Sequence, residues 1–138
     1  MKIVDEELYQ AAVKALDRSY SVYSHFRVGA AARLKDGRII TGANMENSSY
    51  GLTLCAERVC IFRSRMEGAE RENFVSFCIT GDTDDPISPC GACRQVMYEM
   101  LPHETPVYLT NLKGDCKVMT VDELLPYFPT DKDIQEHA

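Results

Sequence analysis

The chain has 138 residues and a formal net charge of -6, with 15 Lys and Arg against 21 Asp and Glu. This length suits one domain with its own hydrophobic core, so we expect residues 1–138 to form a single domain with a polar tail at 129–138. The acidic balance argues against a nucleic-acid partner, because such proteins gain affinity by placing Lys and Arg at phosphates. No run approaches the roughly 20 apolar residues of a membrane span, and the acidic start lacks an apolar signal core. We therefore expect a cytoplasmic protein that binds no membrane.

The first third of the chain predicts a helix followed by a hairpin. Asp5 is a candidate helix cap, and the apolar residues after it share one helical face: Leu8, Ala12, Ala15 and Leu16. This helix is expected to run to about residue 20. Residues 28–34 suit a strand, and Asp36-Gly37 predicts a tight turn before a second strand that contains Ile39 and Ile40. The two strands should be antiparallel.

The rest of the chain alternates helices and strands. A helix is expected to begin near Cys55, a buried central strand spans residues 74–79, and another helix starts by Cys90. Residues 106–110 predict a strand, and Gly114-Asp115 predicts a turn. The sequence from Thr120 to Glu123 matches the capping box of a short final helix, and residues 131–138 form a polar end that should fray. This order predicts an α/β three-layer sandwich, with helices on both faces of a mixed sheet of about five strands.

Three cysteines and one glutamate predict a catalytic zinc site. Cys90 and Cys93 form a Cys-x-x-Cys pair that can place two sulfurs at about 2.3 Å from one ion, and Cys55 supplies a third ligand. Three protein ligands leave the fourth tetrahedral position to water. Glu57 follows Cys55 by two residues, so on a helix it points away from that sulfur and is a candidate acid and base, not a ligand. Helix starts at Cys55 and Cys90 would favour the thiolate form.

Two other interpretations of the cysteines stand beside this one. A wholly structural metal site needs a fourth ligand, for which the chain offers its remaining cysteines and its histidines: Cys60, Cys78, Cys116, His25, His103 and His137. A redox pair of the thioredoxin kind would leave the third cysteine and the glutamate without a role. Because the sequence shows no export signal, we expect the cysteines to stay reduced. Cys60 and Cys78 should then act as small buried apolar residues.

Four motifs in the same order resemble the small, homotetrameric cytidine deaminases. They are Tyr23-Ser24-His25-Phe26 before Val28-Gly29-Ala30-Ala31, then Asn44-Met45-Glu46-Asn47, then Cys55-Ala56-Glu57-Arg58, then Ser88-Pro89-Cys90-Gly91-Ala92-Cys93-Arg94-Gln95-Val96. The resemblance covers residues 8–128. It implies zinc-dependent hydrolysis of cytidine or deoxycytidine to uridine or deoxyuridine plus ammonia, in pyrimidine salvage. It also implies one zinc ion per chain and a homotetramer with shared active sites.

The resemblance assigns roles to single residues. Glu57 would take a proton from water, pass it to N3 of the ring, and then protonate the leaving amine. Arg58 would donate hydrogen bonds to the zinc-bound sulfurs, with Arg94 as a further candidate helper. The implied substrate contacts are Phe26 stacked on the base, Asn44 and Glu46 at the ribose hydroxyls, Ala56, and Tyr50 near the subunit boundary.

The chain departs from the family pattern at two places. Arg27 replaces the proline usual after the stacking aromatic, which makes it a candidate for contact with a ligand or a neighbouring subunit. The family's Leu-Leu-Pro segment leads, two residues later, to an aromatic that closes a neighbouring subunit's pocket. Here Leu124-Leu125-Pro126 is followed at once by Tyr127 and Phe128, and one of these is expected to fill that role.

Three rival functions follow from the same residues. Within the same reaction class, the substrate would be another aminopyrimidine nucleoside, such as blasticidin S or a modified cytidine. A deaminase acting on polynucleotides is disfavoured by the net acidity and by the absence of a basic, aromatic stretch. A non-catalytic, zinc-stabilised interaction module would have no use for Glu57.

Overall fold

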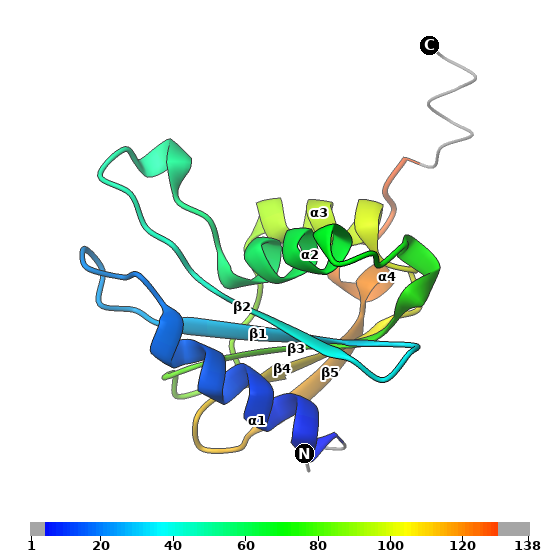
Figure 1. Cartoon of the computed structure of the whole chain (residues 1–138), viewed down its shortest axis with the longest axis horizontal. Coiled ribbons are helices and arrows are strands. Elements are labelled where there is room, and N and C mark those ends of the chain that lie inside the picture. The colour runs from blue at the N-terminus through cyan, green and yellow to red at the C-terminus, as the bar shows by residue number, and fades with distance from the viewer. Residues whose placement is uncertain (1–4, 130–138) are drawn as a thin grey trace.

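The structure is a computed structural model that describes residues 5–129, and its centre is one mixed, five-stranded sheet (Figure 1). The strands lie in the order β2-β1-β3-β4-β5. Their bounds are β1 (Val28–Leu34), β2 (Ile39–Ala43), β3 (Phe74–Gly81), β4 (Pro106–Thr110) and β5 (Cys116–Thr120). Only the β3 and β4 pair is parallel, and the other neighbours are antiparallel. The predicted mixed sheet with a buried central strand is confirmed.

Helices cover both faces of this sheet (Figure 1). On one face lies α1 (Glu6–Ala15); on the other lie α2 (Ala56–Met66) and α3 (Gly91–Met100), with the short α4 (Val121–Leu124) after β5. Three short 3-10 turns, η1 (Leu16–Arg18), η2 (Tyr50–Leu52) and η3 (Arg71–Asn73), complete the elements of the described chain. The predicted three-layer α/β/α arrangement is therefore confirmed. No helix within residues 5–129 is long and apolar enough to cross a membrane.

Local sequence signals account for the helix ends. The Asp5 carboxylate caps α1 by accepting from the Leu8 amide at 3.1 Å, and it also accepts from Nε of Arg33 at 2.8 Å. The predicted apolar stripe of α1 is buried, with Leu8 wholly enclosed. The helix does not run to residue 20, because its last turn tightens into η1 and the chain becomes extended at Ser19. The capping box from Thr120 to Glu123 is confirmed at the start of α4.

Two glycines let helices lie directly on strands. A Cβ at Gly29 would lie 2.0 Å from the carbonyl oxygen of Ala12 in α1, and a Cβ at Gly42 would lie 2.4 Å from the amide nitrogen of Cys60 in α2. Backbone atoms cannot rotate away as a side chain does, so only glycine permits these approaches. Gly42 thereby fixes how close α2, with its amino-terminal end, sits to the sheet.

The predictions for the remaining cysteines are mostly confirmed. Cys60 and Cys78 are buried, and burial raises the pKa of the Cys78 thiol to about 12. Cys116, which the sequence places in a polar stretch, is also buried and begins β5, a strand that no sequence pattern singled out. The predicted polar end at residues 131–138, with His137, lies outside the described residues.

Candidate active site

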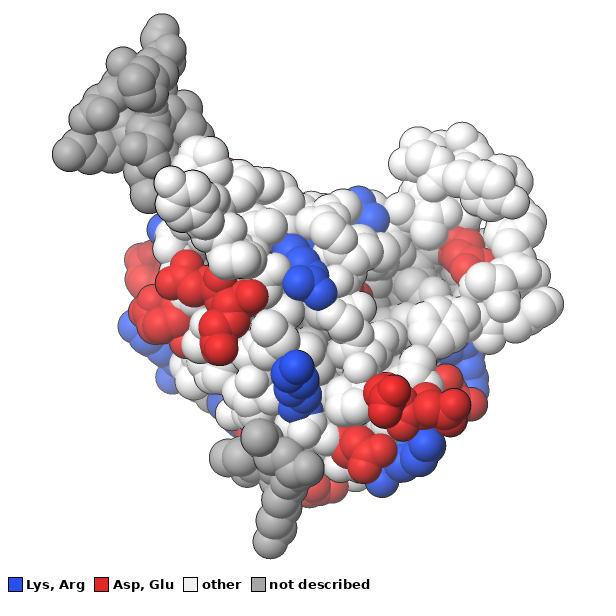
Figure 2. All heavy atoms as spheres, turned by 180° about the vertical axis from the view of Figure 1, so that it is seen from behind, with Lys and Arg blue, Asp and Glu red and all other residues white. Residues whose placement is uncertain are grey.

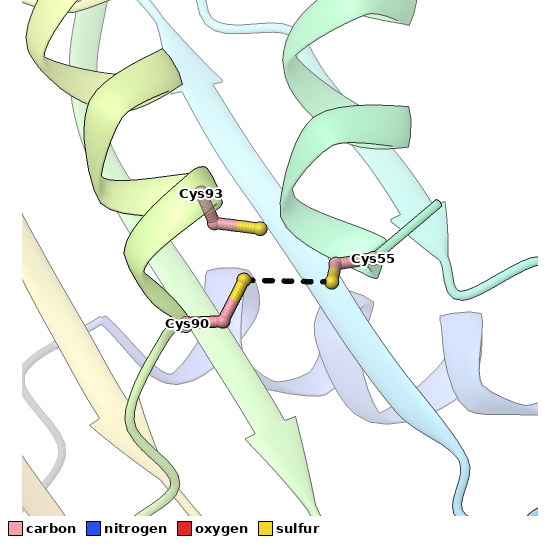
Figure 3. Close-up of side chains that lie close together, drawn as sticks. All are labelled: Cys55, Cys90 and Cys93. Carbon is pink, nitrogen blue, oxygen red and sulfur yellow. Dashed lines mark hydrogen bonds between the residues drawn. The ribbon is translucent and has the colours of Figure 1, made fainter. Parts of the chain in front are cut away.

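The starts of α2 and α3 bring three sulfur atoms together. Cys55 is the cap residue before α2, Cys90 is the cap residue before α3, and Cys93 lies in the first turn of α3. Their side chains point toward one another, as Figure 3 shows. The sulfur of Cys55 lies 3.7 Å from that of Cys90, and the three sulfurs all lie within 4.8 Å of one another. The predicted convergence of positions 55, 90 and 93 is confirmed.

This geometry fits one tetrahedral zinc ion. Two thiolates at about 2.3 Å from such an ion lie about 3.8 Å apart, which agrees with the Cys55–Cys90 separation. Soft thiolate donors select zinc over hard cations such as magnesium. Within residues 5–129 no fourth cysteine, histidine or carboxylate joins the group. A site with three protein ligands keeps one position open, as catalytic zinc sites do and closed structural sites do not.

Charges around the sulfurs favour the thiolate at Cys55. Hydrogen bonds from Cys93, and to a smaller extent from Arg58 and Cys90, together lower the pKa of Cys55 to about 5. The hydrogen bond between Cys93 and Cys55 raises the pKa of Cys93, because its proton is held between the two sulfurs. A metal ion that binds here must displace this proton, since thiolates are the ligand form.

Arg58 lies beside the metal-ligand group, as predicted. Its Nη2 lies 3.5 Å from the sulfur of Cys55 and 3.5 Å from the carbonyl oxygen of Thr53. Its Nε is buried without a partner among the described residues. The guanidinium therefore places a fixed positive charge against a sulfur that would otherwise add to the excess negative charge of three thiolates.

Glu57 occupies the first turn of α2, next to the sulfurs. Its side chain is only 4% exposed, and no cation lies close enough to pair with it as a salt bridge within residues 5–129. Burial raises the pKa of this carboxyl group to about 7, and the nearby Cys55 thiolate contributes to the rise. A bound dication would act in the opposite direction. A carboxyl group balanced between these effects can both accept and release a proton near neutral pH.

Residues 44–54 form an arm that projects from the body of the molecule before α2 and carries three of the predicted substrate contacts, Asn44, Glu46 and Tyr50 (Figure 1). Figure 2 shows a hollow between this arm and the body of the molecule. Part of it is a cavity of about 380 Å³, which lies between the arm and the loop of residues 19–27 that precedes β1, called the facing loop below. Six residues line this cavity: Tyr23, Ser24, Glu46, Asn47, Tyr50 and Thr53. The structure thus places Glu46 and Tyr50 at one cavity. Phe26 lies on the facing loop, 42% exposed, and Ala56 is buried beside Glu57 in α2.

The side chains of Asn44 and Glu46 already form hydrogen bonds to other residues of this chain. The Asn44 Oδ1 accepts from the Ser19 hydroxyl at 2.6 Å and from the Val28 amide at 2.9 Å, and its Nδ2 donates to the carbonyl of Phe26 at 2.8 Å. One N–H of Asn44 is left for a ligand. These bonds also fix the backbone of Phe26, so Asn44 orients the residue predicted to stack on the base.

The carboxylate of Glu46 holds the facing loop in the same way. It accepts from the amides of Tyr23 at 3.0 Å and Ser24 at 3.1 Å, and also from the Ser24 hydroxyl. Sequence patterns had not singled out Ser19, nor any role for Ser24. For Ser24, the one available signal was its place in the Tyr23-Ser24-His25-Phe26 motif. Local patterns could not show the hydrogen bonds of either serine, because both bond to residues more than 20 positions away.

Arg27 pairs within its own chain, and its predicted contact with a ligand or a neighbouring subunit stays a prediction. Its Nη1 lies 3.7 Å from a carboxylate oxygen of Asp17 in η1, which follows α1 on the opposite face of the sheet from the sulfurs. Val28, the next residue, packs in the core beneath α2 and α3. Alternation of side chains along an extended chain therefore turns Arg27 away from the site.

The two aromatic residues near the end of the described chain differ in placement. Phe128 packs on Tyr98 of α3, with ring centroids 4.8 Å apart, and Tyr98 in turn stacks on His103 at 3.9 Å. Tyr127 is fully exposed and has a positive φ of 53°. Only Tyr127 is thus free of packing within its own chain.

Comparisons with known proteins agree with this site. The family model for the cytidine and deoxycytidylate deaminase zinc-binding region matches residues 2–109. Cytidine deaminase of Halalkalibacterium halodurans is 50% identical over 129 residues, which is 94% of this chain and 96% of that protein. Cytidine deaminase of Sporosarcina psychrophila is 47% identical over 121 residues, 88% of each chain. The crystal structure of cytidine deaminase from Burkholderia pseudomallei superposes with a TM-score of 0.88 at 42% identity, covering 91% of this chain and 98% of that chain. Three sulfurs set for one metal ion, with these matches along most of the sequence, show that the chain belongs to the zinc-dependent cytidine and deoxycytidylate deaminase family.

Proposed function

We propose that this protein hydrolyses cytidine and deoxycytidine to uridine and deoxyuridine, releasing ammonia, and that residues 1–138 form one domain devoted to this reaction. The observation that carries the proposal is the buried carboxyl group of Glu57 in the first turn of α2, beside three sulfurs arranged for one ion. A structural zinc site has no need of a buried acid there. The match to the deaminase family supports the same chemistry.

Glu57 would carry the protons of the reaction. When bound by the three cysteines, zinc supplies the Lewis acidity that makes water a nucleophile at neutral pH. The carboxylate of Glu57 takes a proton from the attacking water and gives it to N3 of the ring, so that C4 accepts the new C–O bond. It then moves a second proton to the departing amine, and the C–N bond breaks to give ammonia. The atoms of cytidine and one water are thus all accounted for in uridine and ammonia.

The facing loop and the arm would bind the nucleoside. Phe26 stacks on the base, and the backbone bonds of Asn44 hold it in place. A carboxylate offers about four lone-pair sites, of which the loop uses three at Glu46, so one remains for a ribose hydroxyl. The last N–H of Asn44 would serve the sugar, while Ala56 and Tyr50 line the pocket wall. An unmodified ribose fits these groups better than a blocked sugar.

The pocket of one chain lies open on its outer side, which supports a homotetramer with shared sites. Tyr50 on the arm is 85% exposed, and Leu52 beside it and Phe62 and Met66 on α2 are also exposed. Exposed apolar side chains on the arm and on α2 are candidates for contacts between subunits. We assign the role of closing a neighbouring pocket to Tyr127 and not to Phe128, because Phe128 is used within its own chain. Sizing in solution should give a mass four times the 15.5 kDa of one chain.

A role in pyrimidine salvage within the cytoplasm is part of the proposal. The product nucleosides are those that such pathways reuse, and the reducing cytoplasm keeps thiols free. The six cysteines are unpaired in the structure, which is the form that the metal site requires. Lys and Arg lie interspersed with Asp and Glu on the face shown in Figure 2, which fits a small-molecule substrate better than a polynucleotide.

The test is the ultraviolet absorbance change when the purified protein meets cytidine. Glu57→Gln, compared at equal zinc content, should lose at least about 100-fold in turnover, because acid and base catalysis contributes about 10²–10⁴-fold. Glu72→Gln, on the exposed η3 turn, is the matched control and should keep wild-type turnover. Equal turnover in Glu57→Gln and wild type would remove Glu57 from the mechanism. No turnover by wild type on any cytosine nucleoside would support the non-catalytic zinc module.

A further inference from the structure

Arg94 on α3 joins the turn that carries Cys90 to the end of α4. Its Nε donates to the carbonyl oxygen of Pro89 at 2.9 Å, and its Nη2 donates to the hydroxyl of Ser88 at 2.6 Å. Its Nη1 donates to the carbonyl oxygen of Leu124 at 2.9 Å. The guanidinium therefore makes three short hydrogen bonds to two segments that lie 30 or more residues apart in the chain. None of these bonds reaches a sulfur, so Arg94 is not the charge helper that the sequence suggested.

The turn held by Arg94 leads directly into the metal-ligand group. Pro89 precedes Cys90, which is exposed and caps α3 without a hydrogen bond from its side chain to the helix backbone. Within the described chain, the neighbouring backbone bond before this turn runs from the Ile87 amide to the carbonyl of Thr110. The position of the Cys90 sulfur thus depends on the backbone of residues 88–89, and Arg94 bonds to both of these residues.

The other end of the connection is firmly anchored. The amide of Val121 donates to the carbonyl of Thr105 at 3.2 Å, and the amide of Asp122 donates to the carbonyl of His103 at 3.0 Å. The Thr120 capping box fixes the start of α4, and Leu124 is buried in the main core. A carbonyl held in this way is a fixed point against which the guanidinium can be oriented.

We propose that Arg94 is a positioning residue that braces the Cys90 turn against α4, so that the Cys90 sulfur keeps its place beside Cys55 and Cys93. The inference rests on the proposed zinc site and deepens it. Arginine suits this task because its planar fork offers five donors in fixed directions, whereas a lysine ammonium is a single charge on a flexible stem. The short helix α4, which supplies none of the three cysteines, thereby contributes to metal retention.

The test measures how fast zinc leaves the protein for a coloured chelator in excess. Arg94→Lys keeps the charge and loses the fork, and it should release zinc about 10-fold faster than wild type, the lower end of the range for groups that orient metal ligands. Ser88→Ala removes one of the three bonds and should accelerate release by a smaller factor. Arg63→Lys is the matched control: Arg63 lies on α2 and donates to the carbonyl of Thr41 at 3.3 Å, away from the sulfurs, so release should not change.

The outcomes separate this inference from the proposed function. The zinc content of wild type is measured first, and a wild type that binds no zinc refutes the proposed metal site itself. If wild type holds zinc and Arg94→Lys releases it within twofold of the wild-type rate, the brace is refuted while the function stands. Equal acceleration in Arg63→Lys would also refute it, because the effect would then be a general loosening. Should Arg94→Lys fail to fold, Ser88→Ala decides: a wild-type release rate from that variant contradicts the brace.

Discussion

Replacing Gly42 by alanine should damage the active site through the backbone of α2. The added Cβ would lie 2.4 Å from the amide nitrogen of Cys60 and 2.7 Å from the carbonyl oxygen of Ala56. An ordinary contact needs about 1 Å more, and neither neighbour is a side chain that can rotate away, so α2 must move from the sheet. Overpacking costs about 1–3 kcal/mol, and a clash with two backbone atoms belongs in the upper part of that range, about 2–3 kcal/mol. Replacing a glycine within a strand regains about 1 kcal/mol, which leaves a net loss of about 1–2 kcal/mol. With about 4 °C per kcal/mol in a domain of this size, the melting temperature should fall by about 4–8 °C.

The movement matters because α2 carries both Cys55 and Glu57. A displacement of about 1 Å in a catalytic group can lower turnover by about 100-fold, so cytidine turnover should fall far more than the loss of stability explains. Gly29→Ala is the matched control. Its Cβ would meet the carbonyl of Ala12 in α1 at 2.0 Å, on the opposite face of the sheet. It should lower the melting temperature at least as much, yet leave turnover by the folded fraction near that of wild type.

Calorimetry and the ultraviolet assay on the same samples give both quantities. A Gly42→Ala protein with wild-type melting temperature and turnover would refute the close packing of α2 on β2. Equal losses of turnover in the two variants would refute the argument that α2 alone transmits the displacement to the site.

Three further predictions concern charge and metal. Hydrogen bonds from Arg33 hold the pKa of Asp5 below its ordinary value, so the charged pair stabilises the fold above about pH 4 and the stabilisation is lost as the pH falls through the lowered pKa. Asp5→Asn, which keeps a cap, should therefore have a free energy of unfolding lower than wild type at pH 7 by less than about 1 kcal/mol, and this difference should shrink as the pH falls below about 4. A difference independent of pH would contradict the pair. Removing zinc with a strong chelator should abolish turnover, and adding zinc back to the weakly buffered protein should release protons from the cysteine thiols, which an indicator dye detects; rebinding without acidification would contradict thiolate ligation. Arg58→Gln should lower turnover by about 10–100-fold at unchanged zinc content, since a neutral amide leaves the charge at Cys55 uncompensated; wild-type turnover would remove Arg58 from the site.

Local signals in the sequence were sufficient for most of the fold. Asp5, the Asp36-Gly37 turn and the Thr120 capping box each act through residues within three or four positions, and each was found where predicted. Strand β5 was not singled out, because its five residues follow a turn closely and mix Lys117 with apolar neighbours. Its pairing with β4 depends on a surface that the sequence does not reveal.

The metal-ligand group could also be predicted, since Cys-x-x-Cys fixes two ligands locally and both segments begin helices. Local sequence patterns could not predict side-chain hydrogen bonds between residues that lie far apart in the sequence. Asn44 bonds to the backbone on both sides of Arg27, and Arg94 reaches Leu124, at separations of 16 to 30 residues.

X-ray absorption at the zinc edge of the purified protein tests the central claim most directly. Three sulfur neighbours at about 2.3 Å and one oxygen neighbour at about 2.0 Å are expected, because Cys55, Cys90 and Cys93 leave one position open. Four sulfur neighbours would mean that another cysteine closes the site, and a protein with a closed site could not activate water at the metal.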